Sequence, residues 1–103
     1  MSEDTDKVFY YTKEGKKINT TCDQLRIPEN IYHSVIDNLH ETLEFVVQTS
    51  LLHNLSTEEI RTMCDKSIAP YSEAMNKYGY EFFIADVTKK KELVNISCFL
   101  RET

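Results

Sequence analysis

The stretch PENIYHSVIDNLHETLEFVVQTSLLHN, from Pro28 to Asn54, carries the strongest periodic pattern in the chain. Its apolar side chains recur every three or four residues, at Ile31, Val35, Ile36, Leu39, Leu43, Val46, Val47 and Leu51. That spacing places them along one side of a helix. Pro28 suits the first helical position, where its missing N–H needs no partner. At about 1.5 Å per residue the helix is about as long as a small domain is wide, so we expect it to organise the fold.

A second helix is predicted to start at Ser56, because Ser56-Thr57-Glu58-Glu59 has the pattern of a capping box. The side chains that follow on its apolar face are Ile60, Met63, Cys64 and Ile68. Pro70 disfavours a helical residue before it, so we expect a break there. A short continuation, Tyr71–Lys77, would then stop near Gly79.

Strands are indicated at both ends of the chain. Residues 7–12 and 17–21 are rich in β-branched and aromatic side chains, and Gly15 between them suits a hairpin loop. Residues 80–87 and 93–100 form a second predicted hairpin, whose turn includes three consecutive lysines. In the last strand one face carries only apolar side chains, at Val94, Ile96, Cys98 and Leu100.

The element order ββααββ predicts an α+β fold, because strands and helices are segregated along the chain. We expect an antiparallel sheet of three to four strands with both helices packed on one face. The 103 residues suffice for one domain, which we place at 7–103. The acidic residues 1–6 are predicted to form a disordered tail.

The composition excludes several classes of function. The net charge of −5 argues against nucleic-acid binding, which draws most of its affinity from cations that replace counterions on phosphates. It also disfavours anionic membrane surfaces, and no apolar run approaches the roughly 20 residues that span a bilayer. Without a secretory signal, and with three cysteines too far apart for a CxxC motif, we expect a cytoplasmic protein.

One side of the long helix carries a row of polar side chains. His33, Asp37, His40 and Glu44 are spaced by four, three and four residues, with Glu41 beside them. Such side chains can ligate a metal, but one helix alone cannot surround an ion, so we predict no metal site and no cofactor. We instead predict that the row binds a protein partner, through Asp37, His40, Glu41 and Glu44.

Aromatic pairs in the strands predict a second partner surface. Neighbouring strand residues point to opposite faces, so Tyr10-Tyr11 and Phe82-Phe83 place rings on both faces of the sheet. We assign Tyr10 and Phe82 to partner binding, because exposed aromatic patches mark interfaces. A homodimer through this sheet face is one form of that prediction. Base stacking is another, which the shortage of positive charge opposes.

Together these features predict a small, acidic, non-catalytic protein that occludes a basic protein partner, in the manner of an antitoxin, an immunity protein or a phage-encoded inhibitor. The first alternative is a dimeric nucleic-acid-binding transcriptional regulator, with a helix-turn-helix across residues 56–78. The second is a small enzyme that uses the His33/His40 row or Cys64 as its reactive group. Against it, Cys64 shares the apolar face of its helix and is expected to be buried.

Overall fold

The computed structural model describes residues 7–103, and the tail predicted for residues 1–6 lies outside them. In chain order the elements are β1 (Lys7–Tyr11), β2 (Lys17–Thr21), α1 (Cys22–Leu25), α2 (Glu29–Leu52), α3 (Thr57–Asn76), β3 (Tyr80–Lys90) and β4 (Leu93–Glu102). Two hairpins thus flank two long helices, which confirms the α+β class. The single turn of α1 was not predicted; the hydroxyl of Thr21 caps its first turn.

α3 begins where the sequence indicated, and α2 begins one residue later than predicted. Pro28 is the residue just before α2, and Ser56 is the residue just before α3. The capping box is present: the Ser56 hydroxyl accepts from the Glu59 N–H at 3.2 Å, and the Glu59 carboxylate accepts from the Ser56 N–H at 2.9 Å. These contacts satisfy amide groups that have no partner inside the helix.

The break predicted at Pro70 is wrong, because α3 runs through it without interruption. Proline in a helix interior removes one hydrogen bond and costs roughly 3 kcal/mol. Here the same helix buries apolar side chains on both sides of Pro70, including Ile68 and Met75. Burying both turns offsets that cost. The helix-turn-helix considered for residues 56–78 therefore does not form.

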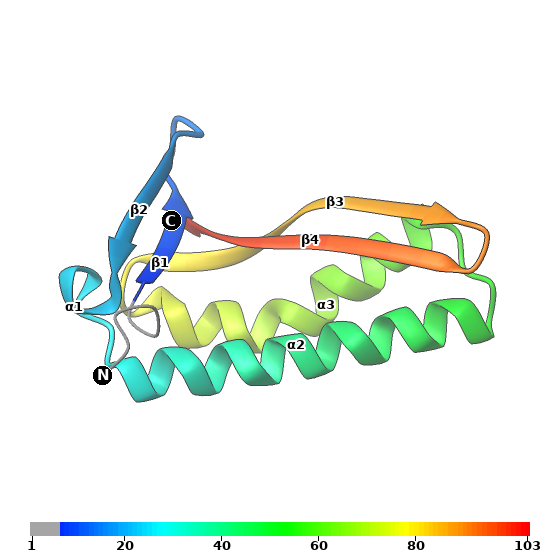
Figure 1. The fold of residues 1–103 in the computed structure, drawn as a ribbon, viewed down its shortest axis with the longest axis horizontal. Coiled ribbons are helices and arrows are strands. Elements are labelled where there is room, and N and C mark those ends of the chain that lie inside the picture. The colour runs from blue at the N-terminus through cyan, green and yellow to red at the C-terminus, as the bar shows by residue number, and fades with distance from the viewer. Residues whose placement is uncertain (1–6) are drawn as a thin grey trace.

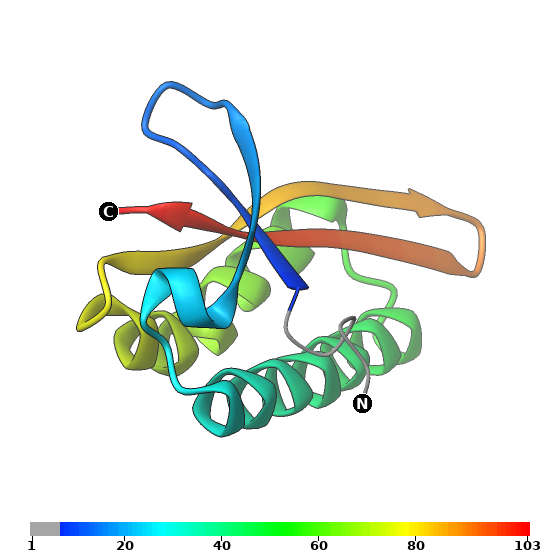
Figure 2. The same cartoon turned by 60° about the vertical axis from the view of Figure 1, so that its left-hand side comes forward.

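The sheet is mixed rather than wholly antiparallel, and its strand order is β2-β1-β4-β3. Each hairpin is antiparallel, but the two hairpins meet through β1 and β4, which are parallel and pair at Tyr11 and Arg101. Figures 1 and 2 show α2 and α3 on the same side of the sheet, as predicted, and the first hairpin rising away from one end. No element among residues 7–103 covers the opposite face.

The second hairpin is longer than predicted, and its strands reach the turn at Lys91 and Glu92. The lysines do lie at its tip. Lys89 holds the tip to the loop between α2 and α3, because its Nζ donates to the Asn54 side chain at 2.8 Å and to the Leu55 carbonyl at 2.7 Å. An irregularity between Ile84 and Asp86 shifts the register of the pair.

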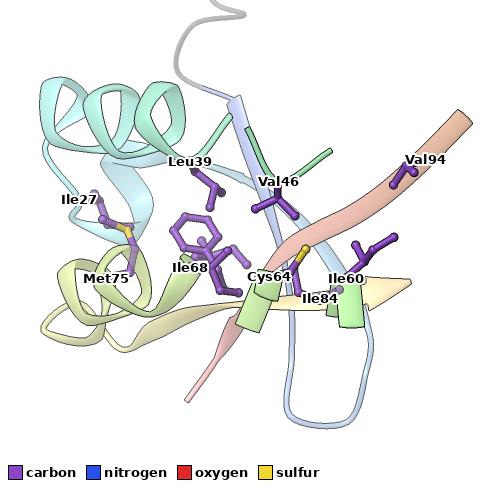
Figure 3. Close-up of a cluster of buried hydrophobic side chains, with 11 residues drawn as sticks. Ile27, Leu39, Val46, Ile60, Cys64, Ile68, Met75, Ile84 and Val94 are labelled. Atoms are coloured by element: carbon purple, nitrogen blue, oxygen red, sulfur yellow. The ribbon is translucent and has the colours of Figure 1, made fainter. Parts of the chain in front are cut away.

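The core lies between the helices and the sheet, as Figure 3 shows. The buried side chains that form it are Ile27, Leu39, Val46, Ile60, Cys64, Ile68, Met75, Phe82, Ile84, Val94 and Leu100. Val94 and Leu100 are buried, and Ile96 and Cys98 pack against the same cluster, so the predicted apolar face of the last strand is confirmed. The hydroxyls of Thr42 and Tyr71, 2.7 Å apart, add a polar link between α2 and α3.

Candidate functional surfaces

The outward side of α2 is anionic along its length. The helix has four carboxylates and contains neither lysine nor arginine. Asp37, Glu41 and Glu44 are exposed, and so is His40. The structure therefore brings all four predicted helix residues to the surface, with the carboxylates spread over about two turns of helix.

Two large apolar side chains stand among these carboxylates. Phe45 is 68% exposed and Leu52 is 79% exposed. At 100° per residue they share an outward arc with Asp37, Glu41 and Glu44. We call these five residues the acidic helix face. Phe45 and Leu52 were not predicted as surface residues, although both are apolar and lie off the repeating apolar stripe of α2.

The histidines of α2 have different surroundings. His33 Nε2 lies 3.7 Å from Glu29 Oε1, one turn earlier, and its ring packs against Tyr32 with centroids 5.7 Å apart. His40 is exposed beside the acidic helix face. Within residues 7–103 no three His, Cys, Asp or Glu side chains lie close enough together to hold a metal ion.

The uncovered face of the sheet carries a cluster of four half-buried rings, which we call the aromatic platform: Phe9, Tyr11, Phe83 and Phe99. The ring centroid of Phe99 lies 5.4 Å from that of Tyr11, 5.6 Å from that of Phe9 and 6.1 Å from that of Phe83. Because β1 meets β4 here, rings from both hairpins come together. Aromatic side chains on this face were predicted, but the two residues assigned to partner binding, Tyr10 and Phe82, lie on the other face.

Phe82 and Tyr10 lie on the helix side of the sheet. Phe82 is 6% exposed and belongs to the core, so its predicted position on the partner surface is wrong. Tyr10 packs against the core cluster and against Tyr80, with ring centroids 5.2 Å apart. The pleat explains both errors, since it sends each one's neighbour, Phe83 or Tyr11, to the open face.

Cations border the aromatic platform. Lys17 Nζ lies 4.3 Å from the ring centroid of Phe9, and the Arg101 guanidinium lies 4.9 Å from that of Phe83. Arg101 also pairs with Glu81 at 2.7 Å. Positive charge beside an aromatic ring is attracted by the electron-rich ring face. The platform thus combines ring surface with positive charge in a chain whose net charge is negative.

The thiol considered as a nucleophile is buried. Cys64 is 0% exposed, as the sequence predicted, and burial raises its pKa to about 11. Burial likewise raises the pKa of Cys98 to about 12, with a further increase from the nearby Cys64. Both thiols are therefore protonated at neutral pH, and the thiolate is the nucleophilic form.

Comparison of the chain with protein-family models and curated proteins found no match, and comparison of its fold with solved structures found none either. In residues 7–103 no helix combines the length and the apolar character needed to cross a membrane.

Proposed function

We propose that the protein is a non-catalytic regulator or inhibitor that occludes a basic protein partner through the acidic helix face of α2. The observation that carries the proposal is the exposure of Phe45 and Leu52 among three carboxylates, on a helix without a single lysine or arginine. The carboxylates complement the charge of a basic partner surface, and the two apolar side chains can pack against its apolar part.

The charges supply the long-range attraction. Asp37, Glu41 and Glu44 are exposed and have no basic side chain on their own helix to neutralise them. A surface of one sign raises the rate at which an oppositely charged partner arrives, and salt screens that effect over about 8 Å at physiological ionic strength. We therefore expect association to slow as salt is added.

The two apolar side chains supply the affinity after contact. Burying exposed apolar surface is favourable by about 25 cal/mol per Å². Aromatic anchors near the centre of an interface carry much of its binding energy. Phe45 has this position, with Glu41 one turn before it and Leu52 two turns after it. We expect Phe45 to be the principal anchor.

The face is also held in place before binding. α2 buries Leu39 and Val46 on its inner side, and the hydroxyl of Thr42 pairs with that of Tyr71 on α3. A preformed surface loses less conformational entropy when it binds. A preformed helix therefore favours tight binding, because it covers the partner surface without a change of conformation.

The test is affinity capture from native lysate with the wild-type chain, followed by purification of the captured protein and measurement of the complex by calorimetry. The doubly charge-reversed variant Glu41→Lys with Glu44→Lys should abolish binding, and Phe45→Ser should weaken it at least tenfold. Asp65→Lys with Glu73→Lys is the matched control, since it reverses two exposed carboxylates on α3. Circular dichroism should show all variants folded.

The proposal predicts a basic partner whose affinity falls with added salt. Full affinity in the charge-reversed variant would show that α2 is not the docking surface. Equal losses of affinity in the α3 control pair and in the α2 pair would mean that only net charge matters, which would contradict a specific binding face.

A further inference from the structure

We infer that the aromatic platform binds single-stranded nucleic acid, with bases stacked on its rings and phosphates near the cations at its border. This site is separate from the acidic helix face, and the inference does not depend on the proposed function. It rests on two features of residues 7–103: the arrangement of four rings on an uncovered sheet face, and the uneven distribution of charge.

The rings provide a stacking surface. Phe9 and Tyr11 come from β1, Phe99 from the adjacent β4 and Phe83 from the next strand, β3. Neighbouring centroids are 5.4 to 6.1 Å apart, and every ring is half-buried rather than covered. The ring planes cross at 55° to 86°, so each base would stack on a separate ring. Sheets that recognise RNA stack two or three unpaired bases on aromatic side chains. The platform spans enough strands for that number of bases.

The charge beside the rings opposes that of the whole chain. The hairpin from Lys7 to Thr21 has four lysines and only one acidic residue, Glu14. Four of the chain's 17 acidic residues lie on α2, on the other side of the sheet, and Glu81 at the platform is paired with Arg101. The net charge of −5 is therefore a poor guide to the field that a ligand meets on the platform. Lys17, directly over Phe9, is placed to contact a phosphate when a base replaces it on the ring.

The first hairpin gives this cationic segment its position. It rises away from the end of the sheet at which the platform lies, as Figures 1 and 2 show. Its loop contains Lys13 and Lys16, both exposed. A flexible single strand whose bases stack on the rings can run along the hairpin, so that its phosphates lie near these lysines. A duplex keeps its bases stacked inside, so it cannot use the rings.

A second copy of the chain fits the platform less well. A two-fold interface places the same patch on both partners, so it would bring two copies of the lysine-rich first hairpin to one interface. Nucleic acid supplies the missing negative charge. We therefore commit to single-stranded nucleic acid as the occupant, and treat self-association as an outcome that would overturn the inference.

The experiment uses fluorescein-labelled 12-nucleotide single strands of mixed sequence, one RNA and one DNA, with a 12-base-pair DNA duplex as comparison. Fluorescence anisotropy at low salt should show binding of a single strand in preference to the duplex. The affinity should fall with salt with a slope of about −0.7 per phosphate contacted. Which of RNA and DNA binds more tightly identifies the source of the ligand.

Variants then locate the site. Tyr11→Leu and Phe83→Leu keep apolar bulk but remove a stacking ring, and each should weaken binding by roughly 5- to 100-fold. Lys17→Glu should weaken binding further than Lys17→Arg. Lys66→Glu, on α3, is the matched control and should bind nearly as wild type. The charge-reversed α2 variant should retain binding, which separates this site from the acidic helix face.

Several results would overturn the inference. The first is the absence of an anisotropy change at low salt with up to 100-fold excess protein. The second is equal affinity for the single strand and the duplex. The third is unchanged binding in both ring variants while they remain folded. Sedimentation can give a fourth such result. If the wild type is a dimer, the Tyr11→Leu variant is a monomer and neither binds the oligonucleotides, the platform is the interface with a second copy of the chain.

Discussion

The hydroxyl of Ser72 on α3 makes two hydrogen bonds to the backbone of Phe82 on β3. It accepts from the Phe82 N–H at 2.9 Å and donates to the Phe82 carbonyl at 3.2 Å. β3 is an outer strand of the sheet, so these backbone groups have no neighbouring strand to pair with. Nearby, Arg61 Nη1 donates to the Ile84 carbonyl at 3.1 Å. Side chains of α3 thus cover the open edge of β3, a protection against edge-to-edge association.

Replacing Ser72 by alanine should expose that edge. Ser72→Ala leaves the Phe82 N–H and carbonyl without their partner, which should lower the free energy of unfolding by roughly 1–3 kcal/mol. Urea denaturation measures this loss, and light scattering should show more self-association. Ser34→Ala, at an exposed position of α2, is the control for the change in helix propensity. Equal stabilities of the two variants would contradict a structural role for the contact.

The sequence predicted the fold where the determinants are local. Each hairpin joins neighbouring strands, and the capping box of Ser56 and Glu59 fixes a helix start with four consecutive residues. Which strands of the two hairpins meet is not a local property. The parallel contact of Tyr11 with Arg101 follows from how both hairpins pack on the helices. The one local indication of strand order is that β2 is short and polar, which is typical of a strand at a sheet edge.

The candidate surfaces were predictable to a similar degree. Helical periodicity correctly placed Asp37, Glu41 and Glu44 outside, because a period of 3.6 residues separates the two sides of a helix. The alternation of a strand could not show which of Phe82 and Phe83 faces outward, because two adjacent aromatic residues fit either phase of a strand. The charge on the open sheet face was also hidden, because total charge does not record which face carries the lysines.

Pro70 offers a test of the continuous α3. Pro70→Ala restores a backbone N–H that can bond to the carbonyl of Lys66, and it should raise the free energy of unfolding by up to roughly 3 kcal/mol. Pro70 is exposed, so the substitution leaves no cavity. Urea denaturation measures the gain, and far-ultraviolet circular dichroism should show unchanged or slightly higher helicity. A large loss of stability would mean that the chain needs the proline for packing or turn geometry.

The capping box should make stability depend on acid pH. Hydrogen bonds from Ser56, first from its backbone N–H and then from its side chain, hold the pKa of Glu59 below its ordinary value of 4.5. A lowered folded-state pKa stabilises the fold above about pH 4.5, and this contribution is lost as pH falls through the folded-state value. Glu59→Gln should therefore differ most from wild type at pH 7 and least near pH 3, as measured by urea denaturation. A constant difference across that range would contradict the assignment.

The thiols should react slowly while the chain is folded. Burial raises the pKa of Cys98 to about 12, and Cys22 and Cys64 are fully buried. Disulfide reagents attack the thiolate, so at pH 8 Ellman's reagent should label the native protein far more slowly than the protein in 8 M urea, where three thiols should appear. Because Cys98 is the least buried, we expect any slow native labelling to disappear in Cys98→Ala. Rapid labelling of one thiol that survives in Cys98→Ala and disappears in Cys64→Ala would contradict the buried environment described for Cys64 and return it to consideration as a nucleophile.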